Sequence, residues 1–203
     1  MKVFIFDMGG VVVHNVSIIP EMAKALGISP DDFYRFAGSD PHATHTHPYH
    51  TGDLAEFMKG TITTKQFWDK FSKRSGLTVK EDLWYTHFKP DLDTNTVQVI
   101  RDLKKAGYRV VCGTNTLEAH YRYHLEHDEY EPFDKVYASD AMGIIKPDPE
   151  FWKYIIKEEQ VKPEEAFFTD DYKENTDAAQ KLGLRVHQFI NAEGLRAALK
   201  EYL

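Results

Sequence analysis

The sequence predicts an α/β protein: a doubly wound parallel sheet into which an all-α segment is inserted. Short apolar runs bounded by glycine are typical of buried parallel strands, and here they alternate with stretches of helical periodicity. An order of β, α, β, α indicates a parallel sheet with helices on both faces. Residues 14–93 show helical periodicity and no convincing strand. We therefore expect a core of residues 1–13 and 94–203 and a helical cap of residues 14–93.

Five short runs rich in β-branched and aromatic residues are expected to form the sheet. They span residues 2–6, 108–112, 135–138, 166–168 and 185–188. Helical spacing of apolar residues predicts core helices at 94–105, 148–159, 173–182 and 192–203. Gly107 is placed to end the first of these helices, and Pro149 suits the first turn of the second. Cap helices are expected at 19–26, 30–36, 52–59, 63–75 and 79–85.

Composition limits the classes of function. The chain has 203 residues, of which 42% are hydrophobic, so disorder is excluded as its main state. Its formal charge of −7 comes from 32 acidic against 25 basic residues, and it predicts no binding of nucleic acid or anionic lipid. No apolar run approaches the roughly 18 to 20 residues that span a bilayer, and Asp7 interrupts the apolar start, so no signal peptide is expected. The single Cys112 forms no intrachain disulfide, which fits a reducing compartment. We expect a cytoplasmic protein, monomer or homodimer, that contacts no membrane.

The ends of four predicted strands carry the chemistry. Ligands of open parallel sheets bind at the carboxyl ends of the strands. Each group has an ordinary alternative, such as a turn, a helix cap or loop punctuation, but the ordered set of four indicates a site. In chain order the groups are Asp7-Met8-Gly9-Gly10, Thr114-Asn115-Thr116, Lys146-Pro147-Asp148 and Asp170-Asp171.

These residue types suit phosphoryl transfer. Three carboxylates gathered at one site would repel each other and a phosphate dianion. A hard divalent cation such as Mg²⁺ removes both conflicts. Lys146 adds a positive charge, the Thr114 hydroxyl donates a hydrogen bond, and Gly9 and Gly10 let backbone amides approach an anion closely. Positioning and charge neutralisation of this kind are what phosphoryl transfer requires.

The ordered set resembles the haloacid dehalogenase-like superfamily, whose four motifs occupy these strand ends in this order. The resemblance covers residues 4 to 186, is most specific at 143–149 and 167–175, and implies a Rossmann-like core with a helical cap. Within the superfamily the chain is similar to small phosphatases that act on sugar phosphates and related small phosphorylated metabolites.

The resemblance assigns roles to individual residues. Asp7 would be the nucleophile that forms an aspartyl phosphate, and it would also bind magnesium together with the Gly9 carbonyl. Asp171 would be a further magnesium ligand, with Asp170 supporting it directly or through water. The phosphoryl group would be held by Thr114, Asn115, Lys146, Gly9 and Gly10.

One position departs from the family pattern. The family has a second aspartate two residues after the nucleophile, which protonates the leaving group and then activates water, and Gly9 stands there in this chain. Loss of such a group slows turnover by a factor of about 10² to 10⁴. A good leaving group, as in an anomeric sugar phosphate or an acyl phosphate, would need little protonation, and some similar members carry glycine here. Alternatively, a cap histidine, His14 or one of the cluster His42, His45, His47 and His50, would take over.

Two other functions stay open at this point. The chain would be a degenerate member that binds a phosphorylated ligand or a partner without turnover, or a dehalogenase. Dehalogenases need no metal, which would leave Asp170 and Asp171 without a purpose. The histidine cluster is most simply a polar surface loop, with substrate contact or zinc as alternatives. Residues 121–130 indicate a solvated face, His120 would reach the site from the start of its helix, and Cys112 would be a small buried hydrophobe.

Overall fold

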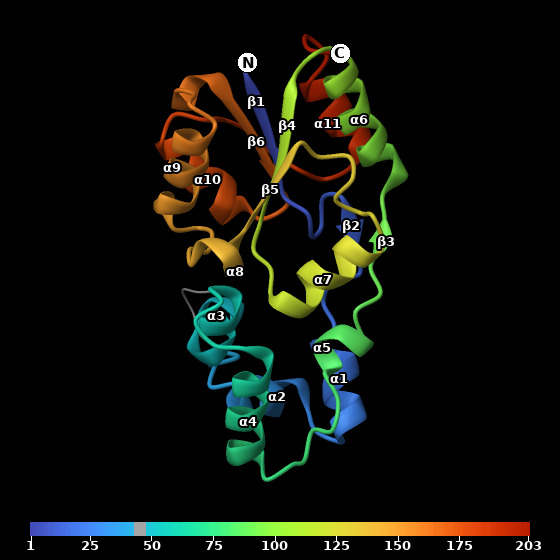
Figure 1. The fold of residues 1–203 in the computed structure, drawn as a ribbon, viewed down its shortest axis with the longest axis vertical. Helices are drawn as coiled ribbons and strands as arrows, with labels where there is room; N and C mark the ends of the chain where they lie inside the picture. The colour runs from blue at the N-terminus through green and yellow to red at the C-terminus, as the bar shows by residue number, and fades with distance from the viewer. Residues whose placement is uncertain (43–47) are drawn as a thin grey trace.

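The structure is a computed structural model, and it describes residues 1–42 and 48–203. A parallel sheet of five strands in the order β5-β4-β1-β6-β7 forms the upper half of the molecule in Figure 1. Its strands are β1 (Val3–Phe6), β4 (Arg109–Thr114), β5 (Lys135–Ala138), β6 (Ala166–Asp170) and β7 (Arg185–Gln188). The predicted α/β fold class and all five strands are confirmed.

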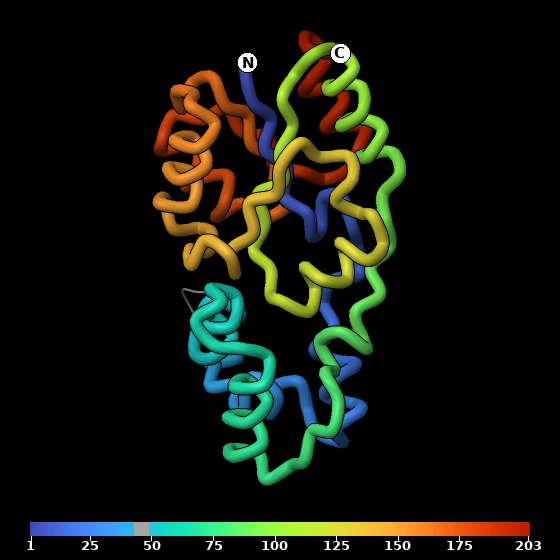
Figure 2. Tube along the Cα trace, in the orientation of Figure 1, coloured from blue at the N-terminus to red at the C-terminus, as the bar shows by residue number. Residues whose placement is uncertain are grey.

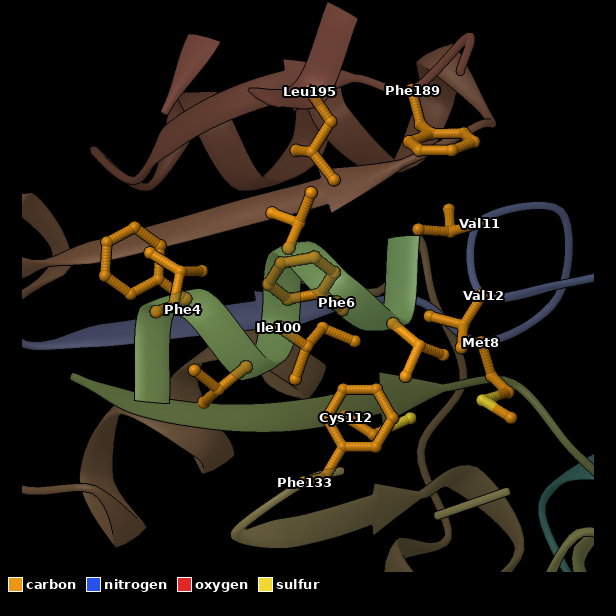
Figure 3. Close-up of a cluster of buried hydrophobic side chains, with 14 of the residues drawn as sticks. Phe4, Phe6, Met8, Val11, Val12, Ile100, Cys112, Phe133, Phe189 and Leu195 are labelled. Carbon is orange, nitrogen blue, oxygen red and sulfur yellow. The ribbon is translucent and has the colours of Figure 1, made fainter. Parts of the chain in front are cut away.

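Alternation along the strands separates two hydrophobic layers. Phe4 and Phe6 of β1 face one side of the sheet, and Val3 and Ile5 face the other, because side chains alternate along a strand. The helices α6 (Thr94–Lys105) and α11 (Ala192–Ala198) cover the first side, and α9 (Pro149–Glu158) and α10 (Lys173–Lys181) cover the second (Figure 1). Figure 3 shows the first layer, in which Phe6 lies near Ile100 of α6.

A group of helices lies at the other end of the molecule. Between β1 and α6 the chain leaves the sheet, builds these helices and returns, as the tube in Figure 2 shows. They are α1 (Ile19–Leu26), α2 (Pro30–Phe36), η1 (Pro48–His50), α3 (Gly52–Met58), α4 (Thr64–Ser75) and α5 (Leu83–Thr86). The fully buried Phe33 lies at their centre, with its ring centroid 4.9 Å from that of Phe71 and 5.8 Å from that of Trp84. These helices therefore have a hydrophobic core of their own.

The chain crosses twice between the sheet and the group of helices. At these crossings the prediction that residues 14–93 contain no strand was wrong. β2 (Val13–His14) and β3 (Asp91–Leu92) pair antiparallel where the chain leaves and re-enters the sheet region. Strands of two residues each carry no hydrophobic period, so sequence pattern has nothing to detect. The predicted helix at 79–85 is also wrong over its first part, because α5 begins at Leu83.

The helix α7 (Glu118–Glu126) lies between the sheet and the helices, beside α5 (Figure 1). The prediction of a solvated face for residues 121–130 is confirmed at Arg122 and at 125–128, which are exposed, and is wrong at His124, Glu129 and Tyr130, which are buried. Of the nine residues of α7, Ala119 and His124 are buried. The remaining short elements are α8 (Ser139–Met142) and η2 (Pro163–Glu165). Across the described ranges, no helix is both long and apolar enough to cross a membrane.

Candidate active site

The side chains predicted at the strand ends meet at one edge of the sheet. Asp7 follows β1, and its N–H donates to the Thr169 carbonyl of β6 at 3.0 Å. Thr114 ends β4 and Asp170 ends β6, while Lys146 reaches them from the loop between α8 and α9. Parallel strands bring their carboxyl ends to the same edge, so residues far apart in the chain become neighbours.

Lys146 is the positive centre of this group. Its Nζ lies 2.7 Å from Asp7 Oδ1 and 2.7 Å from Asp170 Oδ2, and its side chain is 1% exposed. Burial alone would lower the pKa of Lys146, but attraction to Asp170 and Asp7 outweighs burial and raises it. The ammonium is therefore permanently charged and bridges the two carboxylates.

Asp170 and Asp171 are adjacent in sequence but differ in their surroundings. Besides Lys146, Asp170 accepts hydrogen bonds from Asn175 Nδ2 at 3.0 and 2.9 Å and from the Tyr172 N–H at 2.8 Å. Asp171 Oδ1 is buried and has no hydrogen-bond partner among the described residues. Burial and then repulsion from Asp170 raise the pKa of Asp171 to about 6. A buried acceptor without a partner is costly, so Asp171 is the carboxylate that lacks a cation.

The three carboxylates fit a divalent cation. Asp7, Asp170 and Asp171 each place one oxygen within 4.8 Å of the others. Burial raises the pKa of Asp7 to about 7, Lys146 opposes this rise, and Asp170 adds to it. Three carboxylates against one ammonium leave an excess of negative charge in a buried space, and Mg²⁺ favours oxygen ligands of this kind. Asp171 has a coordination position to offer, whereas the oxygens of Asp170 are already engaged.

The two glycines that follow Asp7 and Met8 have different surroundings. At Gly10, φ is +75° and an added Cβ would lie 2.3 Å from Asp171 Oδ2, so only glycine leaves room for that carboxylate. The Gly10 N–H donates to the Val13 carbonyl at 2.7 Å, so it is already engaged. At Gly9 an added Cβ would meet Val16 at 3.5 Å, an ordinary contact. The phosphate-binding roles of Gly9 and Gly10, and the metal contact of the Gly9 carbonyl, stay predictions.

Asn115 clamps the loop that carries Lys146. Its Oδ1 accepts from the Lys146 N–H at 2.8 Å, and its Nδ2 donates to the Lys146 carbonyl at 2.9 Å. The predicted contact of Asn115 with phosphate stays a prediction. In the structure the side-chain amide of Asn115 holds the backbone of Lys146 in place. Thr114 is buried and borders the same cavity as Asp7 and Lys146.

A cavity of about 240 Å³ opens above these groups. Of the histidines proposed to replace the missing acid, His50 of η1 borders it, and its Nε2 lies 3.4 Å from Asn115 Nδ2. His14 instead pairs with Asp93 at 3.6 Å, and His42 lies 3.4 Å from Asp31 on the surface. His45 and His47 lie outside the described residues. His120 also borders the cavity.

Two residues that organise the site received no predicted role, although one of them, Asn175, stands in the specific stretch 167–175. Asn175 holds Asp170, and the buried Ser139 ties three segments together. Ser139 Oγ donates toward the carbonyls of Met58 at 2.7 Å and Thr116 at 3.0 Å, and it accepts from the Thr116 N–H at 2.9 Å. Asn175 lies one helical turn after Asp171, and that spacing was a usable signal. Nothing in the sequence around Ser139 indicates that it meets Met58.

The chain is similar to a known family of hydrolases and to known phosphatases. The family described as haloacid dehalogenase-like hydrolase matches residues 1–183. D-ribitol-5-phosphate phosphatase of Bacteroides thetaiotaomicron is 28% identical over 213 residues, which cover 98% of this chain and 97% of that protein. Sesquiterpene phosphatase astK of Aspergillus oryzae is 34% identical over 93 residues, 45% of this chain. The matched region spans 47% of that relative, about half its length.

Two solved structures share the fold. The enzyme bt-2542 of Bacteroides thetaiotaomicron, in complex with magnesium and inorganic phosphate, superposes with a TM-score of 0.72 at 25% identity, covering 92% of this chain and 93% of that one. A HAD-like family hydrolase from Porphyromonas gingivalis superposes with a TM-score of 0.80 at 24% identity, covering 99% and 97%. The second likeness concerns the fold alone.

Proposed function

The chain belongs to the haloacid dehalogenase-like hydrolases, and on this premise we propose that it is a magnesium-dependent phosphatase of a small phosphorylated metabolite. The observation that carries the proposal is the buried cluster of Asp7, Asp170 and Asp171 around one lysine, in which Asp171 Oδ1 lacks a partner among the described residues. The solved relative bt-2542, bound to magnesium and phosphate, supports it.

In the proposed reaction Asp7 is the nucleophile. Lys146 holds its Oδ1, which leaves Oδ2 to attack phosphorus, and the bond from phosphorus to the leaving oxygen breaks. Lys146 and the Thr114 hydroxyl stabilise the phosphoryl oxygens during the transfer. The leaving oxygen keeps the electron pair of its bond to phosphorus as an alkoxide. A water molecule then attacks phosphorus, the bond from phosphorus to Asp7 Oδ2 breaks, and the proton that the water loses balances the one that the alkoxide takes up, so phosphate and alcohol are released and the Asp7 carboxylate is restored.

Asp7 and Asp171 would hold the magnesium ion, and Asp170 would support them without binding the ion directly. When bound, the ion neutralises the charge that develops on the transferring group. Asp170 is a positioning residue in this proposal, because Lys146, Asn175 and the Tyr172 N–H already occupy its oxygens.

The division into core and cap belongs to the proposal. Residues 1–13 and 94–203 would carry the chemistry, and residues 14–93 would form a cap that selects the substrate. In support, Tyr34, Met58 and Phe88, all from residues 14–93, border the cavity that Asp7 also borders.

A second candidate is a non-catalytic member that binds a phosphorylated ligand. Gly9 favours it, because that position has no group to protonate a leaving alcohol. Clustered buried carboxylates weigh against it, since they are costly for a protein that performs no chemistry on them. A dehalogenase stays less favoured because the Asp170-Asp171 pair would be unused.

Turnover of p-nitrophenyl phosphate with and without Mg²⁺ distinguishes these functions. We expect turnover that EDTA abolishes and added Mg²⁺ restores. Asp7→Asn should abolish it, whereas the matched control Asp177→Asn, on an exposed ion pair of α10, should not change it. Folded protein without magnesium-dependent turnover, or wild-type rates in Asp7→Asn, would contradict the proposal.

A further inference from the structure

Polar and apolar residues border the cavity. The polar ones include Asp7, Asp171 and Lys146 of the proposed phosphoryl site and the hydroxyl-bearing Ser17, Tyr34, Tyr49, Thr116 and Tyr172. Five apolar side chains make up what we call the apolar wall: Met8, Val16, Met58, Phe88 and Leu117. They come from the loop after β1, the segment before α1, α3, the segment after α5 and the segment before α7. A phosphate bound at Asp7 therefore directs the rest of its molecule into a space with a large apolar surface.

Within the part of the chain that the structure describes, the same space offers no lysine or arginine for a second anion. Among the described residues that border the cavity, Lys146 is the one lysine or arginine. Its Nζ is held between Asp7 and Asp170 at 2.7 Å from each. Glu174 and Asp171 border the cavity as well, so they add negative charge. A carboxylate or second phosphate on the substrate would be buried without a cation, and this is strongly unfavourable.

Three histidines border the cavity: His50, whose Nε2 lies 3.4 Å from Asn115 Nδ2, and His120 and His124, which do not supply that cation. His120 stacks on Phe88 with ring centroids 3.7 Å apart and planes at 12°, and burial lowers its pKa to about 3. It is therefore a neutral aromatic ring that extends the wall. His124 also borders the cavity, and its Nδ1 bonds the buried carboxylate of Glu129, which balances any charge on the imidazole.

We propose that the substrate is a phosphate monoester whose leaving group is uncharged and mainly apolar, seated against the apolar wall. This inference rests on the proposed phosphatase function and deepens it. It separates two kinds of alcohol that the proposed function alone leaves equal: polyhydroxylated or anionic leaving groups, and apolar ones. Burial of apolar surface on the wall favours the second kind.

Three monophosphates of primary alcohols test the inference, because their ester linkage is the same and only the tail differs. They are hexyl phosphate, its carboxylate analogue 6-phosphohexanoate, and ribitol 5-phosphate, compared by kcat/KM with saturating Mg²⁺. We expect hexyl phosphate to exceed each of the others by about tenfold or more. A higher kcat/KM for the carboxylate analogue or for ribitol 5-phosphate overturns the inference while the phosphatase function stands. Failure to hydrolyse all three and p-nitrophenyl phosphate overturns the proposed function and the inference with it.

A pair of matched variants ties the preference to the wall. Met58→Lys places a cation on the wall, and Met142→Lys makes the same change at a partly buried methionine that does not border the cavity. In Met58→Lys the carboxylate analogue gains a partner, so its kcat/KM relative to that of hexyl phosphate should rise by about tenfold. Met142→Lys should leave this ratio as in the wild type. Equal ratios in both variants, with both shown to be folded by circular dichroism, would contradict the assignment of the wall.

Discussion

Aspartate substituted for Gly9 tests how this site manages without the family's second acid. The backbone at Gly9 lies outside the left-handed region, and an added Cβ would meet Val16 Cγ2 at 3.5 Å, so the fold accepts a side chain there. Replacement of a glycine whose conformation other residues can adopt stabilises a protein by about 0.4–1 kcal/mol. Gly9→Ala should therefore keep or slightly raise the melting temperature.

The neighbouring glycine supplies the contrast. Gly10 has φ of +75°, and an added Cβ would lie 2.3 Å from Asp171 Oδ2. A left-handed conformation alone costs a non-glycine residue roughly 1–2 kcal/mol. For a domain of this size that corresponds to a fall of about 2–8 °C in Tm, before the displacement of Asp171 is counted. Gly10→Ala should therefore melt earlier than Gly9→Ala in differential scanning calorimetry.

Gly9→Asp should also act on the rate. A carboxylic acid at this position can protonate the leaving oxygen, and such catalysis contributes about 10²-fold or more to turnover. The gain should appear with hexyl phosphate, whose alkoxide leaves poorly, and should be small with p-nitrophenyl phosphate, whose anion leaves without a proton. Gly9→Ala is the control and should show no gain. If Gly9→Asp unfolds, or if its rate with hexyl phosphate stays at the wild-type value, the geometric reasoning on Gly9 is wrong.

Three further outcomes follow from the same contacts. Lys146→Met leaves Asp7 and Asp170 buried without their cation, so urea unfolding should show a loss of about 3–5 kcal/mol, and turnover should vanish; a loss below about 1 kcal/mol would contradict the buried ion pairs. Mg²⁺ at 100 times its Kd should stabilise the wild type by about 2.7 kcal/mol, which raises its melting temperature. Asp171→Asn should remove most of this rise in melting temperature, and an unchanged rise would exclude Asp171 as a ligand. His120 has a pKa lowered from 6.5 to about 3 on folding, so its contribution is complete above pH 6.5 and is lost as the pH falls toward 3. At pH 4.5 the loss in free energy of unfolding is about 2–3 kcal/mol. The free energies of unfolding of the wild type and of His120→Phe should be compared at pH 7 and 4.5, and the loss should be absent in the variant. An equal pH dependence in both proteins would rule out the buried neutral histidine.

Much of the core could be predicted because its signals are local. The central strands β1, β4 and β6 are buried on both faces over almost their whole length, so each appears in the sequence as a short apolar run that ends in glycine or a polar residue. The site residues Asp7, Thr114 and Asp170 stand at or just beyond the ends of such runs, and a parallel sheet brings these ends to one edge, which Lys146 reaches from the loop between α8 and α9. β2 and β3 escaped prediction because two residues have no period. Burial of His124 in α7 escaped prediction because its partner Glu129 and the segments around it are brought there by the fold.

The sequence alone determined the family, the fold class and the types of residue at the strand ends. These properties depend on apolar periodicity and on the order of the motifs, and both can be seen directly in the sequence. Only the tertiary structure decided how neighbouring residues of the same type divide their tasks. Asp170 is held by Lys146 and Asn175 while Asp171 keeps an oxygen without a partner among the described residues, and Gly10 is packed against Asp171 while Gly9 has room for a side chain. Gly10 and Asp171 lie close together in space but far apart in the chain. A contact between distant segments produces no periodic pattern in the sequence, so it cannot be predicted from periodicity.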